Sequence, residues 1–401
     1  MTPRHLVGAR LLAQGLLAPD GAPPTPVEVA RSFAAHQGQD LPGAVSSLAL
    51  RSREPRARTG TAAVQAVLDA FDRGEIVRGY PMRGTVFVVA ADSLAWITEL
   101  CAAGPLRAQV ARRPVLGLDQ EQVDRARAVL EEVAGPRSDP RADPDRDPEA
   151  GRGVPRTELL AAWEAAGLES AKGRGYHLLS HLVALGVAAY GPWRDGDTAV
   201  VLARSWLPAG SDLEGAFGGD RVAAVTELAR RYVMSRGPVT ERDLAWWSKL
   251  TLGEIRAAWP EATSQLESGF ADRDGRLHAR AEDARGGDGE RRWFRPGLVE
   301  EYAEREKEAM AELLLPGFDE LVLGYQDRGV LGDEARVEAL VPGGNGVFRR
   351  PAIRRGEIVG TWKRAGSGAR RRLEIEELTP LSAPQLTRFT RLHERFPAVG
   401  G

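Results

Sequence analysis

Two glutamines separated by a single glycine, Gln37 and Gln39, are the side chains of this chain that most suggest chemistry. An uncharged amide both accepts and donates hydrogen bonds, so a pair of amides can orient a water molecule. Thr25 and Glu28 form a capping signature for a helix before the pair, and Pro42 opens an apolar helix after it. We predict that the pair occupies the turn of a helix-turn-helix, which often faces DNA. Alone, such glutamines are typical of a solvated surface.

Basic residues gather in two further places that could bind anions. Residues 349–372 contain nine arginines and lysines against one acid, and four arginines follow the glutamine pair at positions 51, 53, 56 and 58. Four of the 54 basic residues are lysine and the rest are arginine, whose guanidinium grips phosphate bidentately. Either run fits a solvated face or a set of phosphate contacts, and three DNA-binding modules would favour the second.

Four other side chains or pairs allow a functional and a structural interpretation. His177 and His181 have the spacing of a helical metal pair, but no third ligand follows at a suitable distance, so we expect them to pack or to face phosphate. Trp362 could stack on a base or pack in a core. Asp319 and Asp327 could be catalytic carboxylates, or could cap a helix and form a turn.

Composition places these residues in an ordinary globular protein. The 401 residues are 43% hydrophobic and 27% charged, with a net charge of −2, which leaves nucleic-acid binding open because charge distribution matters more than its sum. The single Cys101 excludes a disulfide framework and a cysteine zinc site. No apolar run reaches membrane-spanning length, so we expect a cytoplasmic protein that does not interact with membranes.

One architectural pattern, helices followed by a β-hairpin, recurs three times. Residues 220–281 give the clearest copy, with the last helix ended by Pro260 and the hairpin turned at Asp274-Gly275. Residues 154–205 give a second copy, with helices at 158–166 and 175–185 and a hairpin turned at Asp195-Gly196. Residues 1–92 give the first copy, with a helix at 61–72 and strands at 75–80 and 85–90. Each copy is typical of a winged helix, and the fold class is α+β.

The remaining segments complete the predicted domain order. Residues 135–153 are rich in Pro, Asp, Arg and Gly and indicate a linker. Strand-like segments at 321–324, 347–353, 357–363 and 371–378 precede a closing helix, which indicates a small antiparallel sheet or barrel. We predict winged helix 1 with further helices at 1–134, the linker at 135–153, winged helix 2 at 154–212, winged helix 3 at 213–285 and a β-barrel at 286–401.

Short motifs spread along the chain resemble the AlkZ-type DNA glycosylases of the tandem winged-helix superfamily. The motifs are QGQDLP (37–42), MRGT (82–85), RGYHLL (174–179), AWWS (245–248), LPGFDE (315–320), LGYQDR (323–328) and GTWKR (360–364). The resemblance implies three winged helices and a C-terminal β-barrel that form a C-shaped DNA-binding channel. It also implies excision of alkylated purines, which in some members extends to bulky adducts or interstrand crosslinks of DNA-alkylating natural products, as self-resistance.

The family's catalytic signature, two glutamines around a small or apolar residue, falls on Gln37 and Gln39; Gly38 is smaller than the apolar residue expected between them. We expect a monofunctional glycosylase, because the first lysine of the chain is Lys172 and none lies near the glutamines in sequence. We further expect a monomer that needs no cofactor or metal. Its expected substrate is double-stranded DNA that carries alkylated purines. DNA contacts are expected at Arg51, Arg83, Thr85, Arg174, His177, Lys363 and Arg364. Supporting roles are expected at His36, Asp319, Asp327 and Trp362.

Two other functions fit winged helices. A non-catalytic regulator is the more common use of this fold, but regulators usually carry one winged helix per chain and dimerise on half-sites. A protein-binding scaffold fits the near-neutral charge but not the basic run at 349–372.

Overall fold

The computed structural model describes residues 3–17, 21–52, 60–139, 150–366 and 371–400. Arg53, Arg56, Arg58, Arg370 and most of the predicted linker lie outside these ranges. The chain divides into two compact units, which we describe separately. Unit 1 comprises Met1–Phe33, Asp40–Ala66 and Thr226–Gly401, and unit 2 comprises Ala34–Gln39 and Val67–Val225. The short segment with both glutamines therefore belongs to unit 2, although the chain on either side of it belongs to unit 1.

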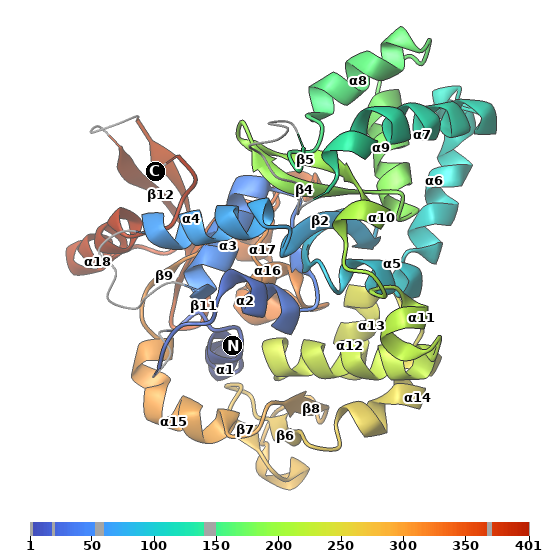
Figure 1. The fold of residues 1–401 in the computed structure, drawn as a ribbon. Helices are drawn as coiled ribbons and strands as arrows, with labels where there is room; N and C mark the ends of the chain where they lie inside the picture. Colours follow the sequence, from blue (N-terminus) through green and yellow to red (C-terminus); the bar gives the residue numbers. More distant parts are fainter. Residues whose placement is uncertain (1–2, 18–20, 53–59, 140–149, 367–370, 401) are drawn as a thin grey trace. The chain divides into compact units, whose positions relative to one another are not determined.

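Unit 2 is built on a five-stranded antiparallel sheet in the order β1-β3-β2-β4-β5. Its strands are β1 (His36–Gln37), β2 (Ile76–Met82), β3 (Thr85–Ala90), β4 (Ala188–Arg194) and β5 (Asp197–Leu202). The two hairpins, β2–β3 and β4–β5, confirm the strands predicted around residues 81–84 and 195–196. Their union was not predicted: β2 pairs with β4 at Arg78 and Tyr190, so the two hairpins form one sheet (Figure 1).

Helices of unit 2 pack on this sheet around a core that includes Trp163, Leu178 and Leu182. The helices are α5 (Leu94–Cys101), α6 (Ala103–Leu116), α7 (Gln120–Ala134), α8 (Arg156–Ala165), α9 (Arg174–Ala184), α10 (Ala203–Trp206) and α11 (Leu213–Phe217), with the 3-10 turn η1 (Gly135–Arg137). Helices α8 and α9 confirm the predicted helices at 158–166 and 175–185. Leucines and Trp163 at helical spacing face the interior, which is why these helices could be recognised from the sequence.

The first half of unit 1 consists mainly of helices. They are α1 (Arg4–Ala13), α2 (Pro26–Ser32), α3 (Leu41–Ser52), the start of α4 (Thr61–Asp72), the end of α12 (Arg221–Arg236), α13 (Glu241–Ser248) and α14 (Leu252–Ala262). The capping box predicted at Thr25 is confirmed, and two further capping boxes begin α13 at Thr240 and α14 at Thr251. The prediction that Pro260 ends the last helix is wrong, because α14 continues through it to Ala262.

The hairpin predicted after α14 is present in a three-stranded sheet ordered β7-β6-β8. Its strands are β6 (Glu267–Ala271), β7 (Leu277–His278) and β8 (Arg291–Phe294), with the 3-10 turn η2 (Ala281–Asp283) between β7 and β8. Helix α15 (Leu298–Ala309) follows and packs beside α1. Helices followed by a hairpin are thus present here as the sequence predicts.

The end of unit 1 is a four-stranded antiparallel sheet ordered β12-β11-β10-β9. Its strands are β9 (Leu313–Leu314), β10 (Arg350–Arg354), β11 (Glu357–Ala365) and β12 (Arg372–Glu377). The helices of this region are α16 (Glu320–Leu323), α17 (Glu334–Leu340) and α18 (Ala383–Glu394), with the 3-10 turns η3 (Gly329–Leu331) and η4 (Pro342–Gly344). Among the described residues β9 and β12 do not pair with each other, so this sheet is open and the predicted barrel is not confirmed. The strand predicted at 321–324 is instead helix α16, because the Asp319 side chain caps it.

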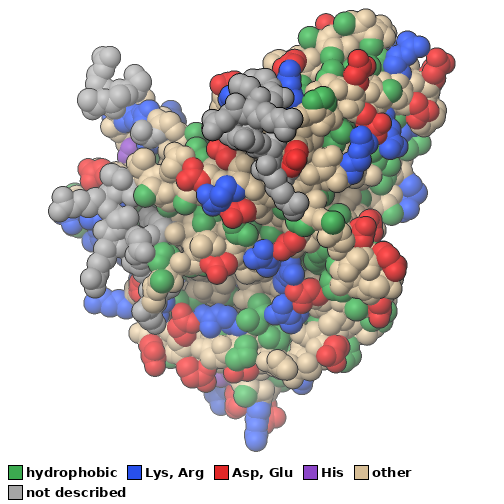
Figure 2. All heavy atoms as spheres, in the orientation of Figure 1, with side chains coloured by type: hydrophobic (Ala, Val, Ile, Leu, Met, Phe, Trp, Pro, Cys, Tyr) green, Lys and Arg blue, Asp and Glu red, His purple; other side chains and the backbone are tan. Residues whose placement is uncertain are grey.

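Charges of both signs are interspersed over the face drawn in Figure 2, in agreement with the net charge of −2. In the part of the chain that the structure describes, no helix has the length and apolar character needed to cross a membrane.

Candidate active site

The glutamine pair lies on and just after an edge strand, not in the helix-turn-helix turn that the sequence predicts. Strand β1 pairs antiparallel with β3, with His36 opposite Val88 and Gln37 opposite Phe87. The Gly38 N–H extends this pairing by donating to the Val86 oxygen at 2.9 Å. The backbone of the pair is therefore fixed by a sheet, which holds side chains more rigidly than a turn does.

The two glutamines have different environments. Gln37 is 5% exposed, and its Oε1 accepts hydrogen bonds from the backbone N–H groups of Gly38 at 3.0 Å and Gln39 at 3.2 Å. Because both partners are donors, they fix the carbonyl end of the amide in this position. Gln39 is exposed, and its Oε1 lies 3.5 Å from the Val86 nitrogen. Gln37 is thus buried and bonded to the backbone of the loop, whereas the side chain of Gln39 is exposed to solvent.

Gly38 has a steric reason to be smaller than the apolar residue expected between the glutamines. A Cβ atom at this position would lie 3.0 Å from the Phe87 carbonyl carbon and 3.0 Å from the Val88 nitrogen. Both are backbone atoms of β3, which cannot rotate away as a side chain would. The missing side chain thus allows β1 to lie close against β3.

Arg78, which the sequence analysis did not single out, contacts the same loop. Its Nη2 donates to the Gly38 oxygen at 3.2 Å, and its Nη1 donates to Thr198 Oγ1 at 2.7 Å and lies 3.3 Å from Asp197 Oδ1. The guanidinium also lies over the Tyr190 ring, 5.4 Å from its centroid. Burial lowers the pKa of this guanidinium from its usual value. A single arginine in a strand carries no sequence signal for such a role.

Arg51, predicted to contact DNA, is instead paired inside unit 1 with Asp319. The pair is bidentate at 2.9 and 3.0 Å, and both side chains are at most 1% exposed. Asp319 also accepts hydrogen bonds from Ser47 and from the Leu321 N–H, which is the capping role. Burial raises the pKa of the Asp319 carboxyl, but Arg51 and these hydrogen bonds outweigh it and hold that pKa below its usual range. Arg51 is thus paired in the interior of unit 1, where its guanidinium has almost no access to solvent.

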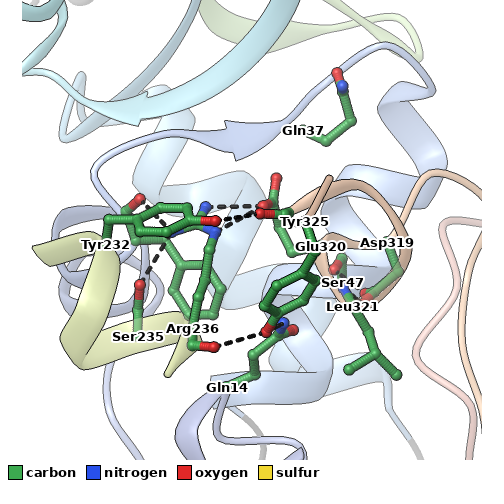
Figure 3. A network of polar contacts seen from close by, with 12 residues as sticks. Gln14, Gln37, Ser47, Tyr232, Ser235, Arg236, Asp319, Glu320, Leu321 and Tyr325 are labelled. Atoms are coloured by element: carbon green, nitrogen blue, oxygen red, sulfur yellow. Dashed lines mark hydrogen bonds and ion pairs between the residues drawn. The ribbon is translucent and has the colours of Figure 1, made fainter. Parts of the chain in front are cut away.

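A second buried ion pair, between Arg236 and Glu320, adjoins the first and was not anticipated from the sequence. Arg236 donates to Glu320 Oε2 from Nε at 3.1 Å and from Nη2 at 2.8 Å, and both side chains are fully buried. Gln14 bonds to Arg51 and to the Tyr325 hydroxyl, which in turn donates to the Arg236 oxygen, so the two pairs form one network. Figure 3 shows the part of this network around Gln14, Tyr325, Arg236 and Glu320. Asp319 and Glu320 of the LPGFDE motif and Tyr325 of the LGYQDR motif therefore lie in the interior of unit 1.

Three of the predicted supporting residues take structural positions. Trp362 is buried, donates from Nε1 to the Leu315 oxygen at 2.8 Å, and packs against Phe396, which is the core alternative. Asp327 is exposed and accepts from the Gly329 N–H at 2.7 Å, as in a turn. His36, which precedes Gln37 in β1, is fully buried.

Predicted DNA contacts of unit 2 lie on the hairpin and on α9. Arg83 has a φ of 60° in the β2–β3 turn and is partly exposed, and Thr85 follows it at the start of β3. Arg174 begins α9, where it donates to the Leu116 oxygen and pairs with Glu169. These three positions keep partial access to solvent.

His177 is largely buried and stacks on His181 with parallel rings whose centroids are 6.1 Å apart. Arg113 donates to His181 Nε2, and His181 Nδ1 bonds to Gln109, which suits a neutral imidazole. Burial and the nearby Arg113 lower the pKa of His181 to about 4 and also lower that of His177. No cluster of three metal-binding side chains occurs among the described residues. The histidines pack, as the alternative to a metal pair predicts.

Apart from Arg51, the predicted DNA contacts of unit 1 are Lys363 and Arg364, which lie on β11. Lys363 is 73% exposed and pairs with Glu374 of β12 at 3.1 Å, and Arg364 is half-buried beside it. Burial and the neighbouring Arg371 and Arg350 lower the pKa of Arg364. Arg350, Arg364 and Arg371 thus bring positive charges together beside the Lys363–Glu374 pair.

Comparison with known proteins gives a family and a fold. Residues 30–399 match the family described as DNA glycosylase AlkZ-like. The solved structure of Streptomyces sahachiroi DNA glycosylase AlkZ resembles this one with a TM-score of 0.64 and 18% identity, over 99% of this chain and 97% of that chain. Curated protein sequences give no match. Because the family match covers nearly the whole chain, this protein belongs to the AlkZ-like DNA glycosylase family and is a DNA glycosylase.

Proposed function

We propose that this glycosylase hydrolyses the N-glycosidic bond of alkylated purines and that Gln37 and Gln39 form its catalytic loop. The observation that carries this proposal is the asymmetry of the pair: Gln37 Oε1 is held by two backbone N–H groups, while the adjacent Gln39 is exposed. A fixed amide next to an accessible one is the arrangement needed to place a water molecule at a reacting carbon.

Neutral amides suit this substrate class. Alkylation at N7 gives a purine a positive charge, so the base can leave with the electron pair of its C1′–N9 bond and become neutral without a general acid. Water then forms the new bond to C1′, and its proton passes to solvent. The protein has to orient that water and stabilise the positive charge that develops on the sugar, and an amide oxygen can do both.

The different environments divide these tasks between the two glutamines. Gln39 accepts the hydrogen bond from the attacking water, because its side chain is exposed. Gln37 keeps the loop in shape, because its oxygen already accepts two backbone donors. With no lysine before Lys172 in the sequence, a water nucleophile is favoured over an enzyme amine, so the product is an abasic site.

Winged helices and phosphate contacts are part of the same proposal. Helices followed by the hairpins β2–β3, β4–β5 and β6–β7 support the predicted series of winged helices. Arg83, Arg174, Lys363 and Arg364 are the arginines and lysine that we propose to contact DNA phosphates. Bulky N7-guanine adducts and interstrand crosslinks are further substrates to test, because alkylation at N7 gives them the same positively charged leaving base.

A base-release assay tests the assignment. Duplex DNA with a single N7-methylguanine, or with a nitrogen-mustard crosslink, is incubated with enzyme, and alkali reveals abasic sites. We expect Gln39→Ala to slow single-turnover release about 100-fold or more with little change in DNA affinity, as for loss of one oriented polar group. Gln37→Glu keeps an oxygen acceptor for the two backbone N–H groups and should be more active than Gln37→Leu.

The control is Gln265→Ala, because Gln265 is also an exposed glutamine but lies outside the loop. Wild-type activity in this variant, together with loss in Gln39→Ala, supports the assignment. Undiminished release by Gln39→Ala would overturn it, and release of no alkylated purine by the wild type would overturn the substrate class.

A further inference from the structure

A hydrogen-bonded path leads from a buried arginine to the proposed catalytic loop. Arg78 Nη2 donates to the Gly38 carbonyl oxygen at 3.2 Å. That carbonyl shares one peptide group with the Gln39 N–H, which donates to Gln37 Oε1 at 3.2 Å. The contacts therefore run from the guanidinium, through the peptide group between Gly38 and Gln39, to the side chain of Gln37.

Such a path is cooperative because a peptide group is polarisable. A cation at the carbonyl oxygen draws electron density from the amide, which makes the N–H at its other end a stronger donor. Hydrogen bonds to charged groups are also stronger than those between neutral groups, and Arg78 is largely buried, where water screens its charge little. Its closest acid, Asp197, is half-exposed at 3.3 Å.

We propose that Arg78 is a positioning residue of this glycosylase, which orients the peptide group between Gly38 and Gln39 and thereby holds Gln37 and aims Gln39. The proposal rests on the proposed catalytic role of the glutamines. It gives the second hairpin a part in the reaction, because Thr198 of β5 fixes Arg78 Nη1 at 2.7 Å and the Tyr190 ring of β4 lies against its guanidinium.

A double-mutant cycle between Arg78 and Gln37 tests this coupling. Arg78→Met, Gln37→Leu and the double variant are compared with wild type by single-turnover release of N7-methylguanine, with binding to the same duplex measured in parallel. We expect Arg78→Met to slow release about 10- to 100-fold, the range for loss of a charge-assisted hydrogen bond, with DNA affinity nearly unchanged. If Arg78 acts through Gln37, the double variant is no slower than the slower single variant.

Two variants separate positioning from general folding. Arg78→Lys keeps the positive charge and should recover part of the rate. Arg73→Met is the matched control, because Arg73 precedes the same strand but lies at the surface. Among the ion pairs of the described residues, it takes part only in the one with Glu75, at 2.8 Å. Wild-type release is expected from this variant.

Amide hydrogen exchange at Gln39 gives a measurement that does not need activity. Loss of Arg78 should speed exchange of the Gln39 N–H, while exchange at Val88 of β3 and Val200 of β5 stays slow. Additive rate effects, or unchanged exchange at Gln39, would overturn the proposal. If the wild type released no alkylated purine, the function would be wrong, and exchange at Gln39 would still decide whether Arg78 orders the loop.

Discussion

Buried arginines have different partners in the two units. In unit 1, Arg51 and Arg236 each face a carboxylate that is itself fully buried, Asp319 and Glu320. In unit 2, Arg78 faces a backbone carbonyl and a hydroxyl, with a half-exposed acid beside them. A salt bridge between two buried side chains holds together the elements that carry them. An arginine that donates to a backbone carbonyl instead orients the peptide group of that carbonyl. The same residue type thus supports stability in one unit and geometry in the other.

Among the substitutions that test this comparison, loss of a buried carboxylate should lower the free energy of unfolding most. Glu320→Ala leaves Arg236 as an unpaired buried charge, so we expect the free energy of unfolding to fall by about 3–5 kcal/mol. Urea unfolding of the variant and the wild type measures this directly. The double variant Arg236→Met with Glu320→Leu should lose much less, because it removes both charges; an equal loss would show that the charge is not the cause.

The next effect concerns Gly38 and the reaction rate. Gly38→Ala places a methyl group 3.0 Å from the backbone of β3, so β1 has to move away and the glutamines move with it. We expect base release to slow by an amount equivalent to about 1–3 kcal/mol, the range for overpacking. Single-turnover kinetics beside thermal unfolding test this. A variant as fast as wild type would mean that the loop tolerates displacement.

A smaller effect is the pH dependence that His181 gives to unit 2. Its folded pKa of about 4 lies below the unfolded value of about 6.5, so the unfolded chain binds more protons between these values. Stability therefore falls as pH falls from about 6.5 to 4, by up to about 3 kcal/mol in total. Unfolding at pH 7 and pH 5 should show the fall in wild type and a smaller one in His181→Gln. Asp319, with a lowered pKa, loses its contribution only at more acidic pH.

The smallest effect is expected at the surface pair of Lys363 and Glu374. Lys363→Ala should change the free energy of unfolding by less than about 1 kcal/mol, because exposed ion pairs contribute little. If Lys363 contacts a phosphate, the slope of log affinity against log salt falls in magnitude by about 1. Titration of unmodified duplex at several salt concentrations measures the slope, and an unchanged slope would remove Lys363 from the DNA interface.

Local features of the fold could be predicted from the sequence, and distant pairings could not. Thr25, Thr240 and Thr251 identify helix starts because each cap bonds within three residues. Strand β1 has only two residues, too few to show a periodicity, so the glutamines were placed in a turn. Arg78 and Arg236 give no signal, because their partners lie 40 to 120 and 84 residues away. The family motif identified the glutamines, but only the structure distinguishes their environments.

The separation of Arg51 and Asp319 along the chain has a consequence for synthesis. They lie 268 residues apart, and unit 1 is assembled from three segments with unit 2 between them. At about 5–20 residues per second, a ribosome needs about 13–54 s to reach Asp319 after adding Arg51. Unit 2 ends at Val225 and can fold during that interval, while helix α3 has to wait for its acidic partner. Translation therefore favours completion of the sheet that carries the glutamines before the ion pairs of unit 1 can close.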